Sequence, residues 1–154
     1  MSPSRDRPDD GRTPPTQVEA ARWELRELPL PPGGDVLAFA VEGPLRGDDP
    51  VEVRRLEFLL GEGLGSRRPR GLVLDLRRAP DACGTACGAL LLRLASGARG
   101  EPRPVVLVVA PAQRAAWRAL LDSMGRKSER WLHPDLPSAR AALACVLPGG
   151  SCDP

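Results

Sequence analysis

The sequence contains no isoleucine, asparagine or tyrosine, and Lys127 is its only lysine, so arginine supplies nearly all of its 22 basic residues. We interpret this bias as the codon usage of a GC-rich genome and attach no function to the abundance of arginine by itself. The formal net charge is only +2. So small a charge gives no reason to expect nucleic acid or a membrane surface as a partner.

Long apolar runs are also absent. No stretch approaches the roughly 18 consecutive apolar residues from which a transmembrane helix is usually recognised. The first residues combine proline, arginine and aspartate without an apolar segment, unlike a secretory signal. We therefore expect a cytoplasmic protein.

Metal-binding and redox patterns are missing as well. The four cysteines (Cys83, Cys87, Cys145 and Cys152) match no common zinc-binding or Cys-x-x-Cys spacing, and the only histidine, His133, is far from them in sequence. We expect no metal or other cofactor, and in the cytoplasm we expect reduced thiols. No acidic partner pattern surrounds His133, so we assign it no catalytic role.

The chain has 154 residues, and glycine and proline account for more than one residue in five. They are concentrated at the two ends and in short connecting stretches. We predict a disordered tail over residues 1–21, one domain over residues 22–147, and a flexible tail over residues 148–154.

Apolar periodicity within residues 22–147 predicts strands alternating with helices. We expect a hairpin of strands at 23–28 and 35–41, further strands at 71–76 and 105–109, and at most a short edge strand at 130–133. Helices are expected at 50–63, 86–96, 112–124 and 136–146. Asp49 and Asp135 are the expected N-caps, and Glu52 completes a capping-box pattern with Asp49. The fold class is therefore α/β, with a mostly parallel sheet of four or five strands, an N-terminal β-hairpin and about four helices.

The central segment, residues 71–92, combines a buried strand ending near Asp75, a turn containing Pro80, and a leucine-rich helix. In α/β proteins such a turn, at the carboxyl end of a strand, usually presents the functional surface. The arginines at 67, 68 and 70, just before this strand, are interpreted as a solvated loop, and Trp117 as a core residue.

Four segments, in the right order and spacing, resemble the STAS domain, the fold of bacterial anti-sigma factor antagonists. The stretch 36–45 is similar to the family's strand that ends in Gly-x-Leu, and 72–76 to its central strand ending in Asp-Leu. Residues 104–108 resemble the next strand, and 134–143 the last helix. The resemblance covers about residues 23–146.

This resemblance implies a non-catalytic binding module that regulates transcription by binding an anti-sigma factor or related serine-protein kinase. In the family, that kinase phosphorylates a serine at the start of the helix after the central strand. The implied partner-binding surface comprises residues 43–49 and 81–88. Within it we single out Arg46, Asp48, Asp81, Cys83, Gly84 and Thr85.

At the phosphorylation motif the sequence departs from the family pattern Asp-Ser-Ser-Gly. Counting without gaps from Asp75 places Gly84 at the acceptor position and Thr85 beside it, whereas a shorter register places Ala82 and Cys83 there. We prefer the gapless register because it keeps the following leucines in phase. Neither register supplies a hydroxyl at the acceptor position, so control by phosphorylation is lost or altered.

Two side chains of the turn, those of Thr85 and Cys83, can each be interpreted in two ways. Thr85 is either a displaced phosphoacceptor in the first helical turn or simply the helix N-cap, which we favour. Cys83 is either a thiol whose pKa is lowered near a helix N-terminus or, as we favour, a small packing residue like Cys87. The alternative functions are accordingly a small-ligand or nucleotide sensor, or a redox-responsive α/β protein based on Cys83.

Overall fold

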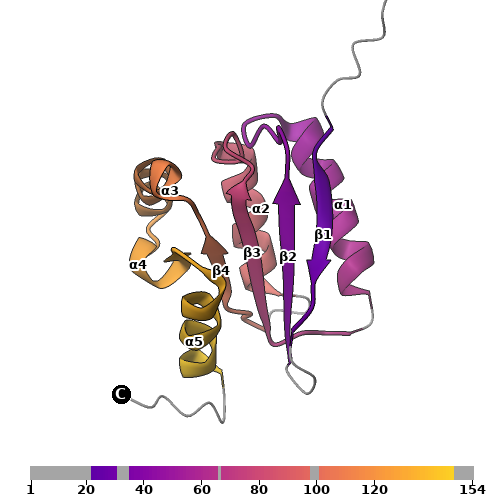
Figure 1. Cartoon of the computed structure of the whole chain (residues 1–154), viewed down its shortest axis with the longest axis vertical. Coiled ribbons are helices and arrows are strands. Elements are labelled where there is room, and N and C mark those ends of the chain that lie inside the picture. Colours follow the sequence, from indigo (N-terminus) through magenta and orange to yellow (C-terminus); the bar gives the residue numbers. More distant parts are fainter. Residues whose placement is uncertain (1–21, 31–34, 66, 98–100, 148–154) are drawn as a thin grey trace, which may run out of the picture.

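A computed structural model describes residues 22–30, 35–65, 67–97 and 101–147, and within them strands and helices alternate along the chain (Figure 1). The tails expected at residues 1–21 and 148–154 lie outside the described residues. The strands are β1 (Glu24–Leu28), β2 (Val36–Glu42), β3 (Gly71–Arg78), β4 (Val105–Val108) and β5 (Leu132–His133). The helices are α1 (Pro50–Leu64), α2 (Thr85–Ser96), α3 (Pro111–Ser123), α4 (Ser128–Trp131) and α5 (Leu136–Val146).

The five strands form one sheet in the order β1-β2-β3-β4-β5. Strand β1 is antiparallel to β2, while β2, β3, β4 and β5 are parallel to one another. The expected α/β class, the N-terminal hairpin and the mostly parallel sheet are therefore confirmed. All parallel strands end at the same edge of the sheet, which brings the β2–α1 and β3–α2 connections together.

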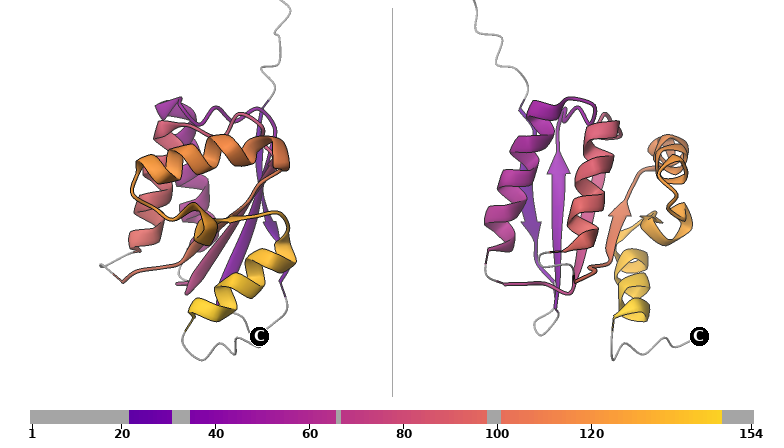
Figure 2. Two further views of the ribbon diagram at one scale, coloured as in Figure 1. Left: turned by 90° about the vertical axis from the view of Figure 1, so that its left-hand side faces the viewer. Right: turned by 180° about the vertical axis from the view of Figure 1, so that it is seen from behind.

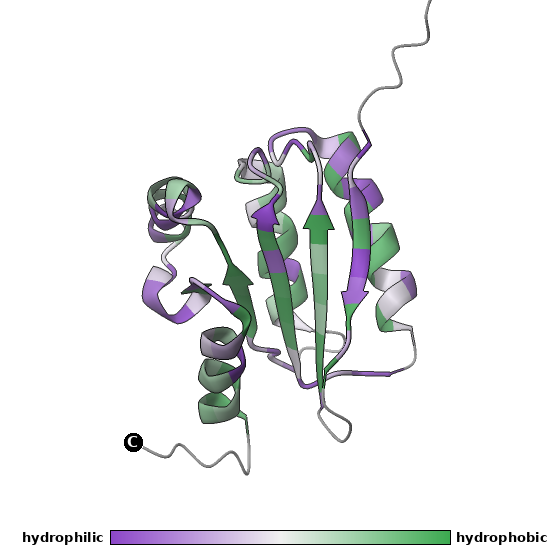
Figure 3. Cartoon of the chain, viewed as in Figure 1, coloured by the Kyte–Doolittle hydropathy of each residue, from purple (hydrophilic) through white to green (hydrophobic). Residues whose placement is uncertain are grey.

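Helices cover the two faces of the sheet unequally. Helices α1 and α2 lie on one face and α5 on the other, as the two side views show (Figure 2). The larger hydrophobic cluster joins α1, α2 and α3 to the sheet residues that point toward them, such as Phe39, Leu74 and Leu107. The smaller cluster joins Ala139 and Leu143 of α5 to Val73 and Val106. The central strands are correspondingly apolar (Figure 3), as expected for parallel strands covered on both faces.

The sheet face against which α5 packs is not fully covered by that helix. Over β1, β2 and β3 this face carries pairs of oppositely charged side chains. Asp75, which follows Val73 on this face, accepts hydrogen bonds from Arg77 Nε at 3.0 Å and Arg77 Nη2 at 2.8 Å. Glu42 accepts from Arg26 at 2.9 Å. Asp75 therefore forms an ion pair on the sheet face, and the partner-binding residues singled out above belong to the loops at the strand ends.

Both expected aspartate caps are confirmed. Asp49 accepts a hydrogen bond from Val51 N at 2.9 Å at the start of α1, and Asp135 accepts from Ser138 N at 2.8 Å at the start of α5. The short edge strand expected at 130–133 is present as β5 at the edge of the sheet, and only the four-residue helix α4 before it was not expected. A helix of a single turn is too short to show an apolar periodicity that a sequence pattern could detect.

Replacing Asp49 with alanine should destabilise the protein by about 1 kcal/mol, because an N–H in the first turn of α1 loses its acceptor. The free energy of unfolding, measured by urea denaturation, checks this. Asp48→Ala is the matched control, because its exposed carboxylate accepts no hydrogen bond within the described residues. Equal stabilities of the two variants would contradict the assigned cap.

Candidate partner-binding surface

The β2–α1 connection (residues 43–49) and the β3–α2 connection (residues 79–84) are joined by backbone hydrogen bonds, and we call them the paired loops. Gly43 N donates to Arg78 O at 2.9 Å, at the base of the two loops. Farther out, Gly47 N donates to Asp81 O at 2.9 Å, and Cys87 N of α2 donates to Gly47 O at 2.8 Å. The two segments nominated from sequence therefore form one continuous structure.

Two glycines allow this close approach. A Cβ on Gly84 would overlap the backbone of Gly47 and Asp48 and would lie 2.6 Å from Gly47 O. A Cβ on Gly47 would overlap the Ala82 carbonyl and would lie 2.9 Å from Gly84 N. Gly84 has an extended backbone conformation, with φ −176°, that any residue can adopt. Gly84 is therefore needed because no space remains for a side chain, and not because of its backbone conformation.

The paired loops expose most of the nominated side chains to solvent. Arg46, Asp48, Asp81 and Thr85 are exposed, whereas Cys83 and Gly84 are half-buried. Between the exposed positions, Leu45 and Ala82 are fully buried and anchor the loops in the core. The surface thus presents one cation, two carboxylates and a hydroxyl on a backbone that is fixed from below.

Glu52 has a different role from the one expected. The capping-box pattern predicts that its carboxylate accepts from the backbone N–H of Asp49. In the structure Glu52 Oε2 instead accepts from Arg46 N at 2.7 Å, and Asp49 N donates to Arg46 O at 3.2 Å. The capping-box prediction is therefore wrong, because the Glu52 carboxylate accepts from Arg46 N and the Asp49 N–H donates to Arg46 O. Glu52 fixes the backbone of Arg46, one of the nominated contact residues.

Thr85 does not cap α2. The N-cap is Gly84, which has no side chain to accept a hydrogen bond, and Thr85 is the first helical residue. The interpretation favoured from sequence was therefore wrong at this position, since the cap lies one residue earlier than expected. The Thr85 side chain is exposed at the positive end of the helix dipole, where an anion is favoured.

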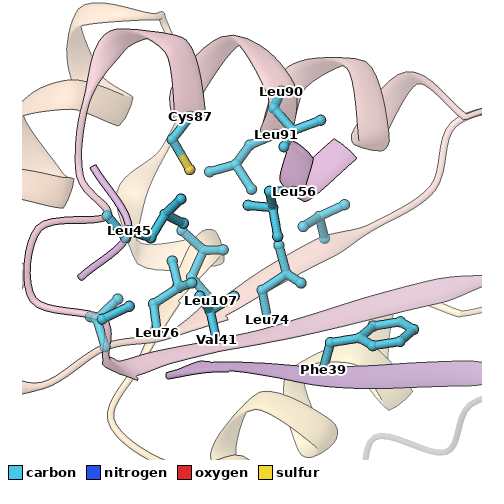
Figure 4. Packing of buried hydrophobic residues seen from close by; sticks show 14 of the residues in the cluster. Phe39, Val41, Leu45, Leu56, Leu74, Leu76, Cys87, Leu90, Leu91 and Leu107 are labelled. Atoms are coloured by element: carbon cyan, nitrogen blue, oxygen red, sulfur yellow. The ribbon is translucent and has the colours of Figure 1, made fainter. Parts of the chain in front are cut away.

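The cysteines of this region lack the properties of reactive thiols. Burial raises the pKa of the Cys83 thiol, which is the opposite of the direction that the redox hypothesis requires. Cys83 also precedes the N-cap, so it lies outside α2, whereas Cys87 lies within it. Burial raises the pKa of Cys87 to about 12. Its side chain points from α2 toward Leu45 and the sheet (Figure 4), as a packing residue does.

Cys145, near the exposed end of α5, is disulfide-bonded, so the expectation of a reduced thiol is wrong there. Cys152 lies outside the described residues. Among the described side chains, no group of histidine, cysteine and acidic residues is arranged to hold a metal ion.

Sequence reasoning missed Gln113, a buried amide at the start of α3. Its Nε2 donates to Leu76 O at 2.9 Å and to Ala79 O at 3.0 Å, and its Oε1 accepts from Ala110 N at 2.8 Å. One side chain therefore connects the end of β3, the beginning of the second paired loop and the cap of α3. A glutamine five residues after the end of β4 gives no sequence signal for such a role.

Comparison with known proteins found no matching family model, no matching curated protein and no matching solved structure. Within the part of the chain that the structure describes, no helix combines the length and apolarity needed to cross a membrane.

Proposed function

We propose that this protein is a non-catalytic partner-binding module of the anti-sigma factor antagonist type, and that the paired loops bind an anti-sigma factor or related serine-protein kinase. The observation that carries the proposal is the joining of residues 43–49 to residues 79–84 and the start of α2. These segments are the ones that the sequence resemblance nominates independently. The proposed compartment of the module is the cytoplasm.

The architecture of the paired loops supports binding more than catalysis. Their exposed groups are Arg46, Asp48, Asp81 and Thr85, and the thiol of Cys83 is half-buried with a raised pKa. No general base lies beside a nucleophile in this set, as covalent catalysis would require. A fixed backbone with mixed charges on its rim instead suits a specific protein contact.

Phosphorylation would not control this surface in the family's usual way. Position 84, which matches the acceptor in the gapless register, is closed by the backbone of Gly47 and Asp48. A serine could not be accommodated there without displacing the β2–α1 loop. The remaining hydroxyl, on Thr85, is exposed and is the only candidate acceptor among the nominated residues.

The test is isothermal titration of the protein with each purified serine kinase of the anti-sigma class from the same genome. We expect one of them to form a one-to-one complex. Asp81→Arg should weaken that complex at least about tenfold, because a charge is reversed at the tip of the paired loops. Glu62→Arg is the matched control, since it makes the same charge reversal on the exposed side of α1 near its far end.

The proposal is contradicted if none of these kinases binds, or if the Asp81 and Glu62 variants lose affinity equally. Incubating the complex with ATP and mapping phosphorylation by mass spectrometry decides the role of Thr85. A phosphate on Thr85 would make it the displaced acceptor, and an unmodified Thr85 in a stable complex would indicate binding without this switch.

A further inference from the structure

A basic cleft lies at the end of the sheet opposite the paired loops. It encloses about 800 Å³ between the last turn of α1, the segments that enter β3 and β4, and the last residues of α5. Among the described residues, its charged lining consists of Arg68, Arg70, Arg103 and Glu101, and its remaining walls include prolines and Val146. This volume is within the range typical of small-molecule sites.

The arginines of the cleft are less fully neutralised than others in the molecule. Elsewhere, Arg77 and Arg93 form two-point ion pairs with Asp75 and Glu57. In the cleft, Arg70 approaches Asp35 only to 3.5 Å, and both side chains are more than half exposed. Within the described residues, Arg68 and Arg103 take part in no ion pair.

The backbone that carries Arg70 and Arg103 is held in place by hydrogen bonds. Arg70 N donates to Asp35 O at 2.6 Å, and Arg103 N donates to Ala95 O at 2.7 Å. Pro104 O, next to Arg103, accepts from Leu72 N at 3.0 Å, which ties the β4 entry to β3. The guanidinium groups of Arg70 and Arg103 therefore extend from fixed points, and the cost of ordering them around a ligand is reduced.

The helix ends near the cleft carry charge of the opposite sign to its arginines. The C-terminal ends of α1, α2 and α5 lie near the cleft, and each contributes about −0.5 of an elementary charge. Among the described residues, the lining carries three arginines and one glutamate, and Asp35 beside Arg70 adds a second carboxylate. The attraction for an anion therefore rests on the guanidinium groups of Arg68 and Arg103, which form no ion pair within the described residues, and not on the net charge of the region.

We propose that this cleft binds a small, multiply charged anion of the phosphate class, such as a phosphate ester or polyphosphate. Guanidinium groups match phosphate oxygens in paired hydrogen bonds and are the side chains best suited to such a ligand. The apolar and proline-lined walls would accommodate an organic portion of the ligand. The site is separate from the paired loops and does not depend on the function proposed for them.

The test is isothermal titration of the full chain with inorganic pyrophosphate, at low and at physiological ionic strength. We expect saturable one-to-one binding, and at least a tenfold weaker affinity in the variant carrying Arg68→Gln and Arg103→Gln. The matched control carries Arg118→Gln and Arg130→Gln, which removes the same charge from exposed positions on α3 and α4. The control should bind pyrophosphate like the unmodified protein.

Absence of saturable binding would overturn the proposal, and so would an equal loss of affinity in both double variants, which would indicate attraction to net charge alone. Circular dichroism and thermal unfolding of both variants separate a binding defect from a folding defect. If the cleft variant does not fold, the single variant Arg68→Gln provides the same comparison.

Discussion

Replacing Gly84 with alanine is expected to destabilise the protein by about 3 kcal/mol, a large effect for the addition of one methyl group. The added Cβ would overlap the backbone of Gly47 and Asp48, and backbone cannot rotate away as the end of a side chain can. The β2–α1 loop would have to separate from the β3–α2 loop. Urea denaturation gives the free energy of unfolding that checks this value.

Gly61→Ala is the matched control for Gly84→Ala. A Cβ on Gly61 meets nothing within 4 Å, and the residue lies within α1, so alanine there should stabilise the protein by about 0.5 to 1 kcal/mol. Gly84→Ser, which returns a hydroxyl to the matched acceptor position, should behave like Gly84→Ala. Wild-type stability in either Gly84 variant would show that the loops are not in close contact.

Replacing Gln113 with leucine should destabilise the protein by about 3 to 5 kcal/mol, because several buried backbone groups would lose their partner at once. Leucine has a similar size, so the effect would come from Leu76 O, Ala79 O and Ala110 N and not from a cavity. The measurement is again the free energy of unfolding. Amide hydrogen exchange should also become faster in residues 79–84, which the glutamine holds.

Ser123→Ala serves as the control for the loss of a hydrogen bond on the same helix. Ser123 Oγ donates to Leu120 O in an exposed position, where water replaces the lost partner. Its effect should be within about 0.5 kcal/mol. A similarly small effect for Gln113→Leu would refute the idea that this amide holds the second paired loop.

Sequence patterns predicted the elements whose residues carry their own signal. Val53, Leu56 and Leu60 repeat at helical spacing and are all buried on α1. Every side chain of the apolar run at 105–108 is buried, as its β-branched composition indicated. Asp49 and Asp135 cap their helices because the capping bond is local. The parallel direction of β2, β3 and β4 follows from the alternation of strands and helices, since parallel strands require a crossover connection.

The contacts that shape the candidate surface are not local, and sequence reasoning missed them for that reason. Gln113 bonds to groups 34 and 37 residues earlier in the chain. Glu52 has two possible backbone partners, and the path of the loop, which no local pattern specifies, decides between them. The cap of α2 falls on Gly84 and not on Thr85 because the backbone of Gly47 lies against it.

The antiparallel direction of β1 determines where the chain enters the domain. Arg22 and Trp23 lie against Gly43, at the base of the paired loops, whereas Val146 and Leu147 border the basic cleft. A fluorophore attached at position 22 would therefore report on events at the paired loops, and one attached at position 147 on events in the cleft. When the binding of partners to the paired loops is measured, the protein should therefore be attached to the sensor surface through its C-terminal side, which leaves the loops accessible.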